Sequence, residues 1–348
     1  MRIPPQFVRR IVLAPAVVLL ALILVTTIPI QLLVVMLLAL IPRFGRITRI
    51  VALLSYYLVL EGLALVILFG LWVASGFGYA LQRPFFQRAH YRLVGWILGE
   101  LFRFARWSLR LTIHHTGADI DRVAPGAPLI IASRHAGPGD SFILVNTLIN
   151  GVRREPRIVL KDTLQWDPTI DVLMNRLPMV FLTPTPFSDR DTRVHGSEPT
   201  KRIAHMAMDM DKDDALVVFP EGGNFSPNRR DSRIRQLKDG GYADLADRAA
   251  SMRNLLAPRP GGLFAAVDAK PDAGLVFVGH TGLEQFDSLK QLWQALPMNK
   301  TLVMNSWYVA PQDIPAGKAE RVEWLFDWWE RIDAWIEATD INANPTNN

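Results

Sequence analysis

The chain contains no cysteine. This absence excludes disulfides, thiolate metal sites and a cysteine nucleophile, and it fits a reducing compartment without proving one. No serine stands in a G-x-S-x-G elbow, which makes a hydrolase the least favoured enzyme class. No segment resembles a nucleotide-binding phosphate loop. The carboxylates of DMDKDD at 209–214 lack the glycine and glutamate of a calcium loop, so we expect no metal site.

Charge is scarce at the front of the chain. Residues 11–41 contain no charged residue, and residues 50–75 contain only Glu61. Each stretch exceeds the roughly 20 apolar residues that a membrane-spanning helix needs. The mean hydropathy of the whole chain, +0.15, is high for a soluble enzyme. Since no cleavage site follows a short apolar core, the sequence predicts retained membrane-embedded helices over residues 1–82.

The first apolar stretch is too long for a straight span. Its 31 residues would make a helix of roughly 46 Å, against a hydrocarbon core of roughly 30 Å. We expect a bend at Pro15 or at Pro29, which follows Thr26 and Thr27. A kinked span and a re-entrant hairpin both remain open. Glu61 is either a functional intramembrane carboxylate or, as we favour, the apex of a second hairpin near the headgroups.

Arginine dominates the same region. Residues 1–110 carry twelve Arg, two Glu and neither Lys nor Asp, a charge of +10, so residues 111–348 carry −5 of the total of +5. This surplus is typical of contact with anionic lipid and is no argument for nucleic acid. Arg lies at all three boundaries of the apolar stretches, so it does not fix their orientation. The N-terminus and the main domain are expected on one side, which we take as cytosolic.

Residues 83–110 interleave arginines with aromatic side chains at helical spacing. This pattern predicts an interfacial amphipathic helix. The alternative is a buried linker helix packed on the main domain.

From residue 111 onward, short apolar runs alternate with helical stretches. Such a pattern predicts an α/β domain over 111–340, with a mixed sheet covered by helices on both faces. We expect strands at 127–133, 156–161, 178–183, 215–220, 274–280 and 301–309, and helices at 140–150, 200–211, 241–256 and 318–338. Residues 341–348 are expected to form a disordered tail.

The closing helix carries one apolar stripe, formed by Trp324, Trp328, Ile332 and Trp335. A face packed on the core is favoured over a second membrane contact.

The candidate chemistry begins at HAGPGD, residues 135–140. An apolar run ends at His135, and a tight glycine turn leads to Asp140. A carboxylate at this spacing can fix the tautomer of the imidazole, whose other nitrogen then takes a proton from a hydroxyl. His114 and Asp119 have the same spacing, so spacing alone is weak evidence. Only His135 ends a predicted buried strand, which is where active-site groups of α/β sheets collect.

A second polar block, VVFPEGGNFS at 217–226, also ends an apolar strand. Gly222 and Gly223 permit close backbone approach, and their amides can hold an anion. Downstream of them, guanidinium groups suited to phosphate are supplied by Arg229, Arg230 and Arg259. For any one of these arginines, a solvated surface position is an equally good interpretation.

Together these motifs resemble the glycerophospholipid (lysophospholipid) acyltransferase superfamily. The likeness rests on HAGPGD and FPEG, preceded by apolar segments, and extends over roughly residues 110–310. Further similar blocks are VLKDTL (159–164), NRLPMVFL (175–182), LLAPRPGGLFAAV (255–267) and LVFVGHTGLE (275–284).

The resemblance implies roles for individual residues. His135 would be the general base and Asp140 its orienting partner, while Lys161 would contact phosphate and Glu221 with Gly222 would belong to the acceptor-binding and structural block. The implied reaction moves an acyl chain from a thioester, acyl-CoA or acyl carrier protein, to a lysophospholipid hydroxyl without a cofactor. The implied location is a bacterial plasma membrane, with membrane lipids as partners. Oligomeric state stays open.

The chain departs from the family pattern beside both motifs. Arg134 replaces the usual Asn before the histidine, and Ala136 replaces a small hydroxyl residue. Gly223 and Asn224 replace a Thr-Arg pair, which removes the arginine expected to bind acceptor phosphate. Arg134, Arg229 or Arg230 can take over that role. We expect 1-acylglycerol-3-phosphate as the acceptor; the alternatives are another lysophospholipid or glycolipid hydroxyl, or an inactive membrane-binding relative.

Overall fold

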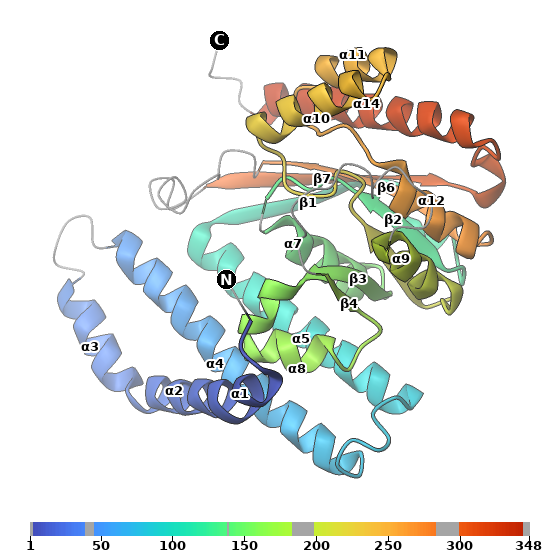
Figure 1. Ribbon diagram of the computed structural model, residues 1–348. Coiled ribbons are helices and arrows are strands. Elements are labelled where there is room, and N and C mark those ends of the chain that lie inside the picture. Colours follow the sequence, from blue (N-terminus) through green and yellow to red (C-terminus); the bar gives the residue numbers. More distant parts are fainter. Residues whose placement is uncertain (1–2, 39–44, 138, 183–197, 283–298, 344–348) are drawn as a thin grey trace. The chain divides into compact units, whose positions relative to one another are not determined.

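The computed structural model describes the chain except residues 1–2, 39–44, 138, 183–197, 283–298 and 344–348 (Figure 1). Several expectations fall outside the described residues. They concern the centre of the Gly-Pro-Gly turn, part of the arginine-containing segment between the two apolar stretches, and residues 344–348 of the expected tail. The described chain forms two compact units. Unit 1 comprises 1–112, 160–184 and 289–300, and unit 2 comprises 113–159, 185–288 and 301–348. The units therefore do not follow linear boundaries, because residues 160–184 pack with the N-terminal helices.

Unit 2 is built on a mixed sheet. Its strands lie in the order β1-β7-β6-β2-β5-β3. Parallel pairing joins β2 to β5 and β6, and β5 to β3, whereas β7 runs antiparallel to β6. The bounds are β1 Leu111–Gly117, β2 Leu129–Ser133, β3 Glu155–Lys161, β5 Asp214–Val218, β6 Gly274–Thr281 and β7 Lys300–Val309. Every residue of β2, β5 and β6 is buried, as their continuous apolar sequences require.

Helices cover both faces of this sheet, as the sequence predicted. In Figure 1, α10, α11 and α14 lie on one side and α7 on the other. The bounds of the helices in this unit are α6 Ile120–Val123, α7 Asp140–Asn146, η2 Thr147–Gly151, α9 Glu198–Met208, α10 Pro227–Asp239, α11 Ala243–Ser251, α12 Pro260–Ala269, η4 Pro311–Asp313 and α14 Lys318–Ala343.

The tryptophan stripe of α14 packs on the sheet. Trp328 stacks on Phe277 of β6 with ring centroids 4.5 Å apart, and Trp324 meets the same ring edge-on at 5.5 Å. Ile332 is fully buried. The prediction of a core face is confirmed.

Two of the longer helices of unit 2 were not expected. Helix α10 is polar and buries none of its residues, so it lacks the apolar stripe that would reveal it. Helix α12 begins at Pro260 and contains Gly261 and Gly262, which are typical of a loop. Pro260 nevertheless fits the first turn of a helix, where its missing N–H costs nothing.

Unit 1 contains the apolar helices. Its elements are α1 Gln6–Val8, η1 Arg9–Leu13, α2 Ala14–Thr26, α3 Ile28–Leu38, α4 Gly45–Ala74, α5 Pro84–Leu109, η3 Asp162–Trp166, α8 Pro168–Met174 and β4 Val180–Leu182. The expected bend occurs at Thr27, between α2 and α3 and two residues before Pro29. Among the described residues, Gln6–Thr26 and Ile47–Ala74 are long and apolar enough to cross a membrane. Their length and composition suggest membrane association.

Helix α4 corrects the interpretation of Glu61. The helix is continuous through this residue, so Glu61 is not the apex of a hairpin. It is 5% exposed, and its backbone carbonyl accepts a hydrogen bond from the Thr169 hydroxyl of α8 at 3.3 Å. Glu61 is therefore a mid-helix residue facing the rest of unit 1.

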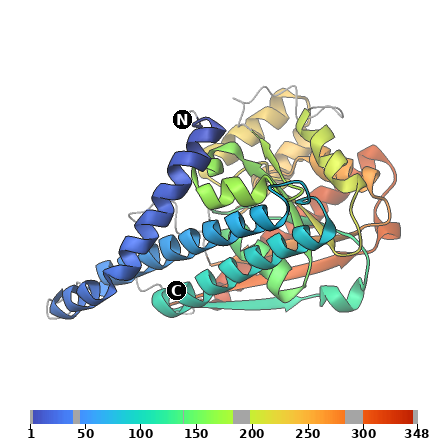
Figure 2. The same ribbon diagram turned by 90° about the horizontal axis from the view of Figure 1, so that it is seen from below.

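Helix α5 runs beside α4 (Figure 2). Its buried face includes His90, Leu93, Val94 and Leu98. Trp107, by contrast, is 74% exposed. The helix is thus amphipathic, with one side packed inside unit 1 and the other exposed.

Candidate active site

The turn after β2 holds the first candidate residues. Parallel pairing with β6 continues one residue beyond the strand, where the Arg134 N–H donates to the Val278 carbonyl at 3.1 Å. The chain then turns and begins α7 at Asp140. This turn brings His135 Nδ1 to 3.1 Å from both carboxylate oxygens of Asp140. The structure brings together the two residues that the sequence analysis paired.

Asp140 is held as an anion. Its side chain is 2% exposed. Backbone N–H groups of Ala136, Gly137 and Ser141 donate to it at 2.7, 3.1 and 2.5 Å. Burial alone would raise the pKa of the Asp140 carboxyl, but the hydrogen bonds and positive charge of His135 and His280 outweigh it and hold that pKa well below its usual range.

The surroundings of His135 decide which of its nitrogens can act. Since an ionised carboxylate only accepts, Nδ1 must carry a hydrogen, and Nε2 is left with the lone pair that can take a proton. The ring stacks on Phe219, with centroids 4.5 Å apart and planes 29° apart. Its side chain is 14% exposed. The imidazole of His135 is therefore held in place and partly accessible.

Glu221 holds the backbone of His135. It is fully buried, and its carboxylate accepts from the His135 N–H at 2.8 Å and the Leu256 N–H at 3.0 Å. Burial raises the pKa of the Glu221 carboxyl to about 7, against the lowering effect of those two N–H groups and of Arg134. The Glu221 side chain thus lies in the interior and holds the backbone of His135, while its expected place in the acceptor-binding block stays a prediction.

Arg134 also has an internal role. It is 1% exposed, and its guanidinium donates to the carbonyls of His280 and Asn254. Its expected role in substrate binding is therefore corrected. Replacing the family's asparagine with this arginine ties the end of β2 to the end of β6.

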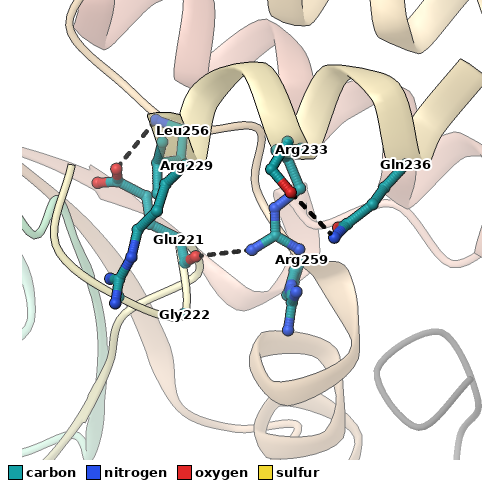
Figure 3. Close-up of a pocket in the computed structure, with 9 residues that line it drawn as sticks. Glu221, Gly222, Arg229, Arg233, Gln236, Leu256 and Arg259 are labelled. Atoms are coloured by element: carbon teal, nitrogen blue, oxygen red, sulfur yellow. Dashed lines mark hydrogen bonds between the residues drawn. The ribbon is translucent and has the colours of Figure 1, made fainter. Parts of the chain in front are cut away.

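Arginines line a pocket on the other side of Glu221. The pocket has a volume of about 190 Å³ (Figure 3). Its lining comprises Glu221, Gly222, Gly223, Arg229, Ser232, Arg233, Gln236, Leu256 and Arg259. Arg233 Nη2 donates to the Glu221 carbonyl at 3.2 Å. One residue, Glu221, thus joins the pocket to the base: its side chain holds His135 and its carbonyl holds Arg233.

The two glycines of the pocket have different functions. Gly222 has a φ of +67°, which side chains disfavour. A Cβ on Gly223 would meet the Arg229 guanidinium, so the missing side chain lets this arginine lie against the turn. Arg229 also donates to the Asn224 carbonyl at 3.2 Å. The chain thereby places a guanidinium beside the Gly223-Asn224 pair, although it comes from α10.

Two expected binding residues lie elsewhere. Arg230 is not part of the pocket lining, and it donates to the carbonyls of Met252 and Ala250 at 2.7 and 2.5 Å, which ties α10 to the segment after α11. Its role as a phosphate ligand stays a prediction. Lys161 is an exposed residue at the end of β3 and belongs to unit 1, so its phosphate contact stays a prediction.

Three polar residues of the pocket were not predicted from the sequence: Ser232, Arg233 and Gln236. His280, which lies beside Asp140, was not predicted either. Arg233 stands one helical turn after Arg229, a signal that was legible only once α10 was known to be a helix.

The other pair with the same spacing, His114 and Asp119, has different contacts. Asp119 caps α6 by accepting the Arg122 N–H at 3.4 Å, and His114 is an exposed residue of β1. Of the two pairs, the structure shows a ring-to-carboxylate contact for His135 and Asp140.

Comparison with known proteins identifies the central part of the chain. No curated protein matches the sequence. A crystal structure of the 1-acyl-sn-glycerophosphate (LPA) acyltransferase PlsC from Thermotoga maritima is similar at 15% identity and a TM-score of 0.45, covering 85% of this chain and 98% of that one. The acyltransferase family matches residues 114–278, which include both motifs. Residues 114–278 therefore form a domain of the acyltransferase family, and the protein is an acyltransferase.

Proposed function

We propose that this enzyme acylates the free hydroxyl of 1-acylglycerol-3-phosphate and so forms phosphatidate. The observation that carries the proposal is the link through Glu221 between a His-Asp pair and a pocket with three arginines. A lysophosphatidate acceptor has a hydroxyl to activate and a phosphate monoester a few bonds away. Guanidinium groups bind such a phosphate through paired, charge-assisted hydrogen bonds.

The reaction needs only the chain and its two substrates. His135 Nε2 takes the proton from the acceptor hydroxyl, and the oxygen attacks the thioester carbonyl of acyl-CoA or acyl carrier protein. The tetrahedral intermediate collapses by breaking the C–S bond, and the thiolate recovers the proton from His135. Asp140 stabilises the imidazolium between these steps. No acyl-enzyme is required, because the thiol is a good leaving group.

The apolar helices of unit 1 supply the setting for this reaction. We place them in a bacterial plasma membrane, with the catalytic unit on the cytoplasmic side. Exposed apolar side chains on α2 and α3 support lipid contact, and they include Leu19, Ile23, Ile30 and Leu32. Both acyl chains would then be recruited from the bilayer.

The test measures thiol release from acyl-CoA by the purified protein in detergent. We expect turnover with 1-acylglycerol-3-phosphate, and at least about tenfold less with monoacylglycerol, which lacks the phosphate and its hydrogen bonds to guanidinium groups. His135→Ala should abolish turnover. Full activity of that variant would sink the mechanism, and a clear preference for monoacylglycerol would sink the proposed acceptor.

The arginine pocket has a matched control on the same helix. Arg233→Gln removes a pocket guanidinium, whereas Arg235→Gln removes an exposed one outside the lining. We expect a higher KM for the acceptor with Arg233→Gln only. Equal effects of the two substitutions would mean that the pocket does not bind the phosphate.

A further inference from the structure

A second imidazole reaches Asp140. His280 lies near the end of β6, and its side chain is 7% exposed. His280 Nε2 lies 3.5 Å from Asp140 Oδ2 and 3.4 Å from the Arg134 carbonyl oxygen. Both of these atoms are acceptors, so Nε2 must carry a hydrogen. Asp140 is thus shared between the imidazoles of His135 and His280.

The fold fixes His280 at this point. Strand β6 pairs in parallel with β2, with Val278 opposite Ser133, so His280 continues beside the turn that carries His135. A Cβ on Gly279 would meet Ile332, Trp307 and Trp335, which places that face of β6 against α14. Since side chains alternate along a strand, the next residue, His280, points to the opposite face, where Asp140 lies.

The backbone of His280 is restrained as well. The Arg134 guanidinium donates to the His280 carbonyl, and the His280 ring faces the Arg134 carbonyl. This reciprocal contact joins the ends of β2 and β6. The ring therefore holds its place before any substrate arrives.

We propose that His280 is a positioning residue that acts on His135 through Asp140. The inference rests on the proposed function, because it assumes that His135 is the base. By donating to Oδ2, His280 restrains the carboxylate and takes up part of its negative charge. His135 then keeps its Nδ1–H directed at Asp140 but is a weaker base than it would be beside an unshared carboxylate.

Besides Asp140 and His135, the described charged groups that contact His280 or the turn beside it are Arg134 and Glu221. Arg134 contacts the His280 carbonyl, and Glu221 holds the backbone of His135. Facing β6 from β7, the residue paired with His280 is Met304, which is uncharged. These groups remain in the variants below, so a change in the pH profile reports the lost imidazole.

Two substitutions separate donation from shape. His280→Leu removes the donor, and His280→Gln restores an N–H near the position of Nε2. We expect His280→Leu to lower kcat about tenfold with little change in KM, and to move the acid limb of the pH profile to higher pH. His280→Gln should recover most of kcat. His114→Gln, at an exposed histidine of β1, is the control and should match the wild type.

Three results overturn the inference. The first is a folded His280→Leu enzyme with wild-type kcat and pH profile. The second is a loss of kcat with an unchanged pH profile and no recovery in His280→Gln, which would indicate a structural role only. The third comes from the wild type, whose histidine ¹⁵N resonances report the tautomer without any variant, and an unprotonated His280 Nε2 contradicts the donation. Absence of acyl transfer by the wild type, or full activity of His135→Ala, instead rejects the proposed function.

Discussion

Asp140→Asn tests the core of the site with one atom changed. The carboxylate accepts on both oxygens: Oδ2 from the Ala136 and Gly137 N–H groups, and Oδ1 from the Ser141 N–H and hydroxyl. An amide keeps only one of these acceptors. If its oxygen stays with Ala136 and Gly137, its NH₂ faces the Ser141 N–H, and a hydrogen bond to a charged acceptor worth about 1.5–3 kcal/mol is lost.

The larger effect of this substitution is on catalysis. The amide NH₂ can donate to His135 Nδ1, which leaves the hydrogen on Nε2 and removes the lone pair that takes the hydroxyl proton. We expect kcat to fall about 10³-fold or more, equivalent to at least about 4 kcal/mol in the barrier. Thiol release from acyl-CoA at saturating acceptor measures it.

The control for Asp140→Asn is Asp119→Asn. Asp119 has the same spacing to His114 but caps α6, and asparagine is an equally good capping residue. This variant should keep wild-type kcat and stability. If folded Asp140→Asn retained more than about a tenth of the wild-type kcat, the activation free energies of the two enzymes would differ by less than about 1.4 kcal/mol. That result would refute the orienting role of Asp140.

Three further predictions concern other parts of unit 2. Burial raises the pKa of Glu221 from 4.5 to about 7, so its contribution to the free energy of unfolding is complete below pH 4.5 and falls by about 3 kcal/mol as the pH rises through 7. The melting temperature of Glu221→Gln should lack this dependence on pH, and an unchanged dependence contradicts the prediction. Gly223→Thr displaces the Arg229 guanidinium, so the KM for a phosphate acceptor should rise, whereas an unchanged KM would exclude Arg229 from binding. Arg248→Ala removes the ion pairs of α11 with Asp327, Glu330 and Glu323 of α14; these are largely exposed, so denaturant unfolding should show a loss of roughly 1 kcal/mol, smaller in high salt, and a salt-independent loss would contradict an ionic origin.

The predictable part of the fold is the part with a strong local pattern. All six expected strands are present, because buried strands require continuous apolar runs such as Leu129–Ser133. Helix α10 escaped prediction, since a solvated helix needs no apolar stripe. The pairing of His135 with Asp140 was predictable because the two residues are close in sequence and share one turn.

The roles of the remaining site residues depend on distant contacts. Arg134 was expected to bind substrate, but its guanidinium meets the His280 carbonyl, 146 residues away in sequence. His280 itself ends an apolar strand, and its relation to Asp140 depends on β6 lying next to β2. A single sequence does not reveal the order of strands in a sheet. Guanidinium and imidazole groups therefore kept several possible roles until the sheet was known.

The stacking of His135 on Phe219 has a consequence for the timing of proton transfer. Phe219 covers one face of the imidazole at 4.5 Å between centroids and Asp140 holds Nδ1, so both contacts restrain rotation about the Cβ–Cγ bond. The nitrogen that receives the proton from the acceptor is therefore the one that returns it to the departing thiolate, with no reorientation between the two events. The ordering cost of the base was met during folding, so binding the substrates does not include it. In the proposed mechanism, proton transfer therefore needs no rotation of the imidazole.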